Sequence, residues 1–150
     1  MGKQNGRMGL STAMVRNAFL VNAAYSENSR EYGFSPQQGQ LLCILRSQPY
    51  GMGELGAVLG LAKSSVTGLV DRLERGGLVR REPDPADSRA VRVALTARGG
   101  KIADQFYTET RERILGLAAG LTDAERETLA ALLARIADEN NVSVIFMDLD

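Results

Sequence analysis

The chain has 150 residues, of which 44% are hydrophobic and 5% aromatic, and 18 basic residues balance 18 acidic ones. This length and composition suit one globular, mostly helical domain, or one subunit whose core a partner completes. The chain has no histidine, the commonest general base and metal ligand, and its single cysteine cannot form an internal disulfide. No apolar run could span a membrane, and the N-terminus lacks a signal-peptide core. We therefore expect a cytoplasmic protein with no metal or other cofactor and no membrane partner.

The charges are distributed unevenly along the chain. Residues 1–51 carry five basic and two acidic residues, residues 52–95 carry seven and six, and residues 96–150 carry six and ten. The middle segment is less basic than a DNA-binding domain usually is. Its slight positive charge predicts modest non-specific affinity for nucleic acid and a corresponding dependence on salt.

Two helices are expected before the middle segment. After a polar, Gly-rich start that should fray, a helical pattern runs from Ser11 to about Tyr32. Ser35 at an N-cap and Pro36 at the first helical position begin a second helix. Its expected core face consists of Leu41, Leu42 and Leu45.

The stretch from Met52 to Leu95 predicts two short helices, a tight turn and a two-stranded hairpin. The first helix has an apolar stripe formed by Leu55, Val58 and Leu59. Gly60 follows where a helix ends with a left-handed residue, and Leu61 offers an apolar anchor in the turn. The second helix has its own apolar stripe, formed by Val66, Leu69, Val70 and Leu73.

The opposite face of the second helix carries small or polar side chains. They are Lys63, Ser64, Ser65, Thr67, Gly68 and Arg72. A helix face that enters a major groove about 12 Å wide needs short side chains, hydroxyl groups and few carboxylates. Two short helices of this kind form the helix-turn-helix pattern, although an ordinary helical hairpin with a solvated polar face is the alternative.

A hairpin that directly follows favours the DNA-binding interpretation. Gly76 and Gly77 end the second helix, and residues 78–82 and 91–95 are expected to form strands around a turn at residues 83–88. Four arginines cluster on this hairpin: Arg80, Arg81, Arg89 and Arg92. Such a hairpin can place an arginine in the minor groove beside the recognition helix. The stretch therefore predicts a winged helix-turn-helix.

The C-terminal part predicts two more helices. Thr96 caps a helix that stops near Gly120, and a capping box at residues 122–125 opens the last one. The apolar face of the last helix comprises Leu129, Leu132, Leu133 and Ile136. Little chain remains to cover the terminal helices, so we expect them to pack against a second copy in a two-fold dimer. The apolar tail, residues 141–150, is expected to pack along that interface.

Between residues 54 and 99 the sequence resembles the MarR family of bacterial transcription regulators. The shared motifs are the Glu-Leu at 54–55, the Ser-x-Val-Thr-x-Leu-Val-Asp-x-Leu-Glu run at 64–74, Gly-Leu-Val-Arg-Arg at 77–81, Asp-x-Arg at 87–89 and Leu-Thr-x-x-Gly at 95–99. Flanking helices of the expected lengths extend the resemblance from roughly Ser11 to Asn140.

The resemblance implies a mainly α fold with a small β-hairpin wing. Residues 1–34 would form an N-terminal dimerisation helix, residues 35–95 the winged helix-turn-helix, and residues 96–150 the C-terminal dimerisation helices and tail, within one structural domain. The implied function is a homodimeric regulator of double-stranded DNA on a palindromic operator, most simply a repressor released by a small-molecule effector. No enzymatic activity is expected.

The resemblance also implies DNA-contacting residues. In the major groove they are Lys63, Ser64, Ser65, Thr67, Gly68 and Arg72, with Arg80 on the hairpin. Arg89 would enter the minor groove, and Asp87 would hold its guanidinium group. Ser35 and Gln37 would lie at a helix N-terminus near the DNA backbone, where free amides could bind a phosphate. A plain N-cap is the alternative for Ser35.

Two positions depart from the family pattern. Gly68 stands where the family often has a longer polar residue, so base readout there would be weak or made by the backbone. Ala62 stands near the N-cap of the recognition helix, where Asp or Ser is more usual. Ser64 is an alternative cap, and that role would remove it from base contact.

Members of the family often sense a small molecule or an oxidant. A pocket is expected between the dimerisation helices and the winged unit. Its candidate lining residues, each with core packing as the alternative, are Tyr25, Tyr32, Phe34, Arg46 and Phe106. Cys43 is expected to be buried and inert, with a redox switch as the alternative. A winged-helix module that binds protein, without strong DNA binding, is the other alternative.

Overall fold

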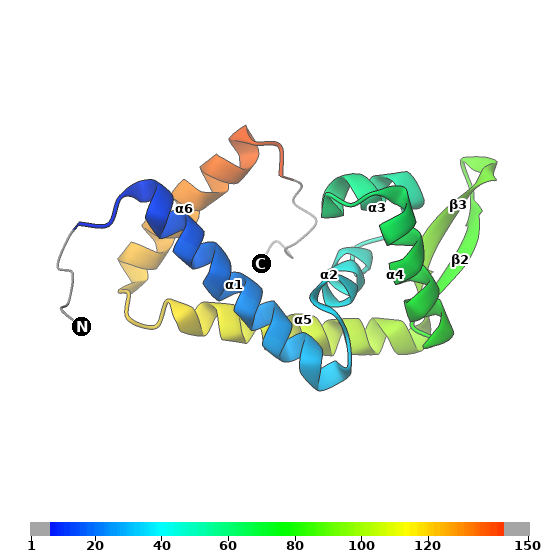
Figure 1. Cartoon of the computed structure of the whole chain (residues 1–150), viewed down its shortest axis with the longest axis horizontal. Helices are drawn as coiled ribbons and strands as arrows, with labels where there is room; N and C mark the ends of the chain where they lie inside the picture. The colour runs from blue at the N-terminus through cyan, green and yellow to red at the C-terminus, as the bar shows by residue number, and fades with distance from the viewer. Residues whose placement is uncertain (1–6, 143–150) are drawn as a thin grey trace.

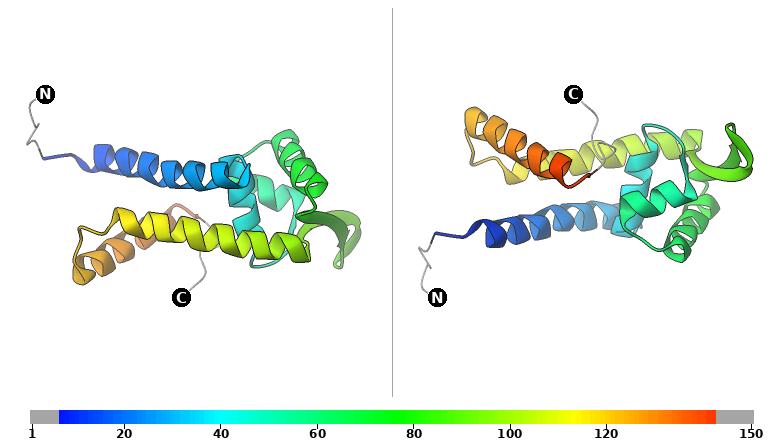
Figure 2. Two further views of the ribbon diagram at one scale, coloured as in Figure 1. Left: turned by 90° about the horizontal axis from the view of Figure 1, so that it is seen from below. Right: turned by 90° about the horizontal axis from the view of Figure 1, so that it is seen from above.

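The computed structural model of the chain describes residues 7–142. Figure 1 shows a winged unit at one end of an elongated molecule, and Figure 2 shows α1 (Leu10–Tyr32) and α5 (Ala97–Leu117) running side by side away from it. Within the described residues, no helix is long and apolar enough to cross a membrane. The mainly α fold with a small β wing is confirmed.

The helices before the winged unit begin and end as predicted. α1 ends at Gly33, whose φ of 73° is the left-handed conformation that glycine adopts easily. α2 (Pro36–Leu45) begins with a capping box, in which the Ser35 Oγ accepts from the Gln38 amide at 3.2 Å and the Gln38 side chain accepts from the Ser35 amide at 2.7 Å. The N-cap role of Ser35 is therefore confirmed.

The two helices of the helix-turn-helix are α3 (Met52–Leu59) and α4 (Lys63–Arg75). Gly60 ends α3 in the left-handed conformation, as predicted. Ala62 is the N-cap of α4 and makes no side-chain cap. The alternative that Ser64 caps this helix is wrong, because Ser64 lies inside its first turn.

A three-stranded antiparallel sheet forms the wing. Its strands are β1 (Tyr50–Gly51), β2 (Val79–Asp84) and β3 (Asp87–Leu95), in the order β1-β3-β2. The predicted turn was too long, since the pairing continues to Asp84 opposite Asp87. Pro83 is tolerated inside β2 because β2 is an edge strand. The two-residue β1 was not predicted.

The last two helices are α5 and α6 (Asp123–Glu139). Thr96 caps α5 by accepting from the Gly99 amide at 3.0 Å, and Thr122 and Glu125 form the predicted capping box of α6. α6 contains no buried residue. The expected packing of the tail concerns residues 141–150, of which 143–150 lie outside the described residues.

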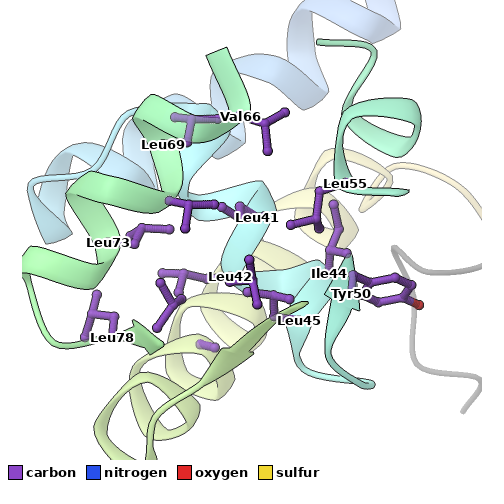
Figure 3. Close-up of a cluster of buried hydrophobic side chains, with 14 residues drawn as sticks. Leu41, Leu42, Ile44, Leu45, Tyr50, Leu55, Val66, Leu69, Leu73 and Leu78 are labelled. Carbon is purple, nitrogen blue, oxygen red and sulfur yellow. The ribbon is translucent and has the colours of Figure 1, made fainter. Parts of the chain in front are cut away.

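The hydrophobic core lies mainly in the winged unit, where α2 packs among α3, α4 and the sheet, and α5 adds Ala103 to it (Figure 3). The predicted stripe of α4 is buried throughout, and Leu55 is the buried member of the α3 stripe. The core residues are Leu41, Leu42, Ile44, Leu45, Tyr50, Leu55, Val66, Leu69, Val70, Leu73, Leu78, Val79, Val93 and Ala103. This packing fixes α4 with its polar face turned outward.

Candidate nucleic-acid interface

The polar face of α4 is open to solvent. Lys63, Ser64, Ser65 and Arg72 are exposed, and Thr67 and Gly68 are half-buried. The Thr67 hydroxyl donates to the Lys63 carbonyl at 2.9 Å, which leaves its oxygen lone pairs available as acceptors. The sequence therefore placed these side chains on the correct side of the helix.

A hollow of about 270 Å³ lies on this face, between α4 and the N-terminal end of α2. We call it the α4 hollow. It is lined by Gln37, Leu61, Ser64, Ser65, Gly68, Leu69 and Arg72. Gln37 is the one α2 residue in this lining, so the structure brings the predicted α2 terminus and the recognition helix together. The Ser35 hydroxyl is instead engaged in its capping box.

Arg89 lies exposed at the tip of the wing. The Asp87 carboxylate accepts from the backbone amide of Arg89 at 3.0 Å, so it does not hold the guanidinium group as expected. An Asp side chain that bonds the amide two residues on stabilises the turn itself. In the described chain the guanidinium of Arg89 has no ion-pair partner, and this group can reach a phosphate or a groove.

The other wing arginines are paired within the protein. Glu82 accepts from Arg92 at 2.6 Å and from Arg80 at 3.2 Å, and Arg80 also donates to the Leu95 carbonyl at 3.0 Å. The hydrogen bonds from the two arginines lower the pKa of the Glu82 carboxyl, and the bond from Arg92 has the larger effect. The Arg80 side chain is still 55% exposed. Arg92 acts within the sheet.

Arg81 joins the wing to the recognition helix, a role that was not predicted. Its guanidinium donates to Asp71 at 2.6 Å and to Glu74 at 2.7 Å, and its amide donates to Glu74 at 3.2 Å. The hydrogen bond to Asp71 is the main reason that the pKa of Arg81 is raised. We call this group the Arg81 clamp. Its single positive charge partly offsets two carboxylates of α4, and its contacts tie the helix to the hairpin.

A cavity of about 510 Å³ lies between α1, α2 and α5. Its lining residues are Val21, Asn22, Tyr25, Gln40, Cys43, Tyr107, Thr110, Arg111, Ile114 and Leu115. Of the five residues that the sequence predicted for a pocket, Tyr25 is the one in this lining. Burial, the largest effect, together with Cys43 and Tyr107, raises the pKa of Tyr25 to about 12. The phenol therefore remains a neutral hydrogen-bonding group at pH 7.

The other four predicted pocket residues do not line this cavity, so their alternative role in packing is the one that the structure favours. Tyr32, Phe34 and Phe106 form an aromatic cluster with ring centroids 5.6 to 6.2 Å apart. Tyr32 donates to Glu109 at 2.9 Å, and burial together with this bond raises the pKa of Tyr32 to about 12. Arg46 pairs with Asp104 at 2.8 Å and lies 3.8 Å from the centroid of the Tyr107 ring. These contacts hold α1 and α2 against α5.

The residues of α5 that line the cavity were not predicted from the sequence. Tyr107, Thr110, Arg111 and Ile114 recur at the spacing of one helix face, and this spacing is the signal that marks them. Cys43 is buried, as predicted, and contributes to the opposite wall.

Comparisons with known proteins place this geometry in a family. The sequence model of the MarR family matches residues 32–90. The regulator YkoM of Bacillus subtilis is 35% identical over 129 residues, covering 85% of this chain and 84% of the relative. The repressor NicR of Pseudomonas putida is 34% identical over 130 residues, covering 85% and 82%.

Solved structures agree with this. Wild-type MarR from E. coli, in its apo form, superposes with a TM-score of 0.77 at 28% identity, covering 88% of this chain and 98% of that one. A MarR-family regulator from Silicibacter pomeroyi superposes with a TM-score of 0.72 at 28% identity, covering 89% and 90%. The winged helix-turn-helix, its open recognition face and these relatives together show that the chain belongs to the MarR family of DNA-binding transcriptional regulators.

Proposed function

We propose that the chain is a repressor that binds a palindromic operator as a homodimer and is released by a small-molecule effector. Residues 35–95 would contact DNA, and residues 1–34 and 96–150 would form the dimer. The observation that carries this proposal is the open polar face of α4 beside the exposed Arg89. The relative NicR, a repressor, supports the direction of control. Because the DNA target lies there, we place the protein in the cytoplasm.

Apolar side chains that the described residues leave uncovered support the homodimer. On α1, Phe19 is 72% exposed and Val15 is 56% exposed, and on α6, Leu132 and Leu133 are each 49% exposed. Apolar patches of this kind on terminal helices are typical of oligomer interfaces. Two α4 helices related by a two-fold axis would meet successive major grooves about 34 Å apart.

The 510 Å³ cavity supports an effector site, since ligand cavities are mostly apolar with a few polar groups that fix orientation. It lies where α1 and α5, which would join the dimer, meet α2 of the winged unit. A ligand that changes this junction changes the spacing of the two recognition helices. A coupling free energy of about 1–3 kcal/mol is typical of such regulation.

Titration of the purified protein with its own upstream DNA, at two salt concentrations, tests the proposed function. Fluorescence anisotropy should show salt-dependent binding of duplex DNA. Failure to bind at low salt would favour a module that binds protein. Arg89→Ala should weaken binding to all sequences and lower the salt slope by about 2, since a dimer loses one arginine from each subunit, while Thr67→Ala should alter site preference. Arg135→Ala, on α6, is the control for loss of an exposed arginine.

The position of Cys43 in the cavity wall favours a second candidate, a redox-sensing regulator. A thiol that is buried in apolar surroundings is ordinarily unreactive toward oxidants. Free thiols are therefore counted before and after mild peroxide, alongside DNA affinity. Loss of the thiol together with loss of affinity would support the redox function.

A further inference from the structure

The α4 hollow is built around a residue that has no side chain. Gly68 lines it, and a Cβ atom placed on Gly68 would meet no heavy atom within 4 Å in the described chain. Its φ is not positive, so the backbone does not require glycine here. Glycine in a helix is less stable than alanine. The absent side chain therefore leaves space in which an external group can approach the helix.

The walls of the α4 hollow suit an apolar group beside a hydrogen-bond acceptor. Leu61 and the small accessible part of Leu69 supply apolar surface, Ser64 and Ser65 supply hydroxyl donors, and Gln37 supplies a side-chain amide. Of the residues that line the hollow, Arg72 alone is charged. Arg, Ser and Gln side chains also contact phosphates, but a phosphate has no apolar part that would cover the leucines of this hollow. The lining is better suited to the edge of a base.

We propose that the α4 hollow recognises a thymine in the major groove. The 5-methyl group would lie beside Gly68 and against Leu61 and Leu69, and a hydroxyl of Ser64 or Ser65 would donate to O4 of the same base. This assignment makes Gly68 a specificity-determining residue. It rests on the proposed sequence-specific binding of duplex DNA.

The test begins with duplexes that the wild-type protein selects from a random pool. In a selected duplex, each thymine is replaced in turn by deoxyuridine, which lacks only the methyl group. We expect one replacement in a half-site to weaken binding about fourfold, as burial of one methyl group predicts. Equal binding of every deoxyuridine duplex overturns the proposal. Failure to bind any duplex at low salt overturns the proposed function instead.

Two variants locate the thymine at Gly68. Gly68→Ala fills the space and should bind the thymine and deoxyuridine duplexes equally. Gly100→Ala, at a helical glycine of α5 where a Cβ also meets nothing within 4 Å, should retain the fourfold difference. Thermal unfolding checks that both variants fold. A fourfold difference retained by Gly68→Ala overturns the assignment, and if this variant does not bind at all, the wild-type comparison decides.

Discussion

At the scale of single residues, the arginines of the wing differ in whether they pair with carboxylates of the protein. The guanidinium of Arg89 has no ion-pair partner among the described residues, whereas Arg81 is used inside the protein, in the clamp with Asp71 and Glu74. The sequence predicted a cluster of arginines but not this division. Which arginine pairs with a carboxylate depends on the angle between α4 and β2, and no sequence spacing specifies that angle.

Arg81→Ala tests the clamp. The substitution should lower the free energy of unfolding by about 1–2 kcal/mol, because it removes two partly exposed ion pairs. DNA affinity should fall about tenfold, since Asp71 and Glu74 then repel phosphates. Adding Asp71→Asn and Glu74→Gln should restore affinity, measured by anisotropy, to within about twofold of a variant with these two changes alone. Affinity that stays low in the combined variant would argue against a charge effect.

The contribution of Glu82 to the stability of the folded protein depends on pH. Hydrogen bonds from Arg92 and Arg80 lower the pKa of Glu82, so its ionised form stabilises the folded state. This stabilisation is present above the ordinary pKa of a glutamate and is lost as the pH falls through the folded pKa. Glu82→Gln should therefore lower the Tm at pH 7, and the difference from wild type should close below about pH 4.

The control is Glu127→Gln, which changes an exposed glutamate of α6. Its Tm should follow wild type at both pH values. A Tm difference for Glu82→Gln that does not change between pH 7 and pH 3 would show that the ion pairs of the wing are not its cause.

At the scale of elements, caps and apolar spacing predicted the helices well. Ser35, Thr96 and Thr122 each begin a helix where expected, because a cap is a local interaction. β1 has two residues, too few for a pattern, and its pairing with β3 is a tertiary contact. On α1, Val15 and Phe19 are exposed, because no other part of the described residues covers them.

The start of α5 packs directly on the chain that leaves α4. A Cβ atom on Gly99 would overlap the backbone carbonyl of Leu78, and backbone cannot move aside as a side chain can. Gly99→Ala should therefore lower the free energy of unfolding by about 3 kcal/mol. Chemical denaturation measures the loss. Gly100→Ala, where a Cβ meets nothing, is the matched control and should be neutral or slightly stabilising. Equal stability of the two variants would contradict this packing.

At the scale of the whole molecule, the motifs of the winged unit predicted the family, and the DNA-contacting residues stay a prediction. The cavity was predicted in place but not in detail. Tyr25 lines it, whereas Phe106 is fully buried in the aromatic cluster with Tyr32 and Phe34. The cavity forms where the side chains of three helices do not fill the space between them, and the size of this space depends on the crossing angles of the helices. Asn28 illustrates the same limit, since it is buried in a hydrogen bond of 2.8 Å to Thr110 across α1 and α5.

The central claim is that uncovered apolar faces on the terminal helices pair two copies of the chain, so that two α4 helices reach one DNA site. Sedimentation equilibrium of the free protein at micromolar concentration, and then with a selected duplex, tests this most directly. The account predicts a mass twice the 16.2 kDa of one chain, and two chains on each duplex. A mass of 16.2 kDa, or a single chain on the duplex, would contradict it.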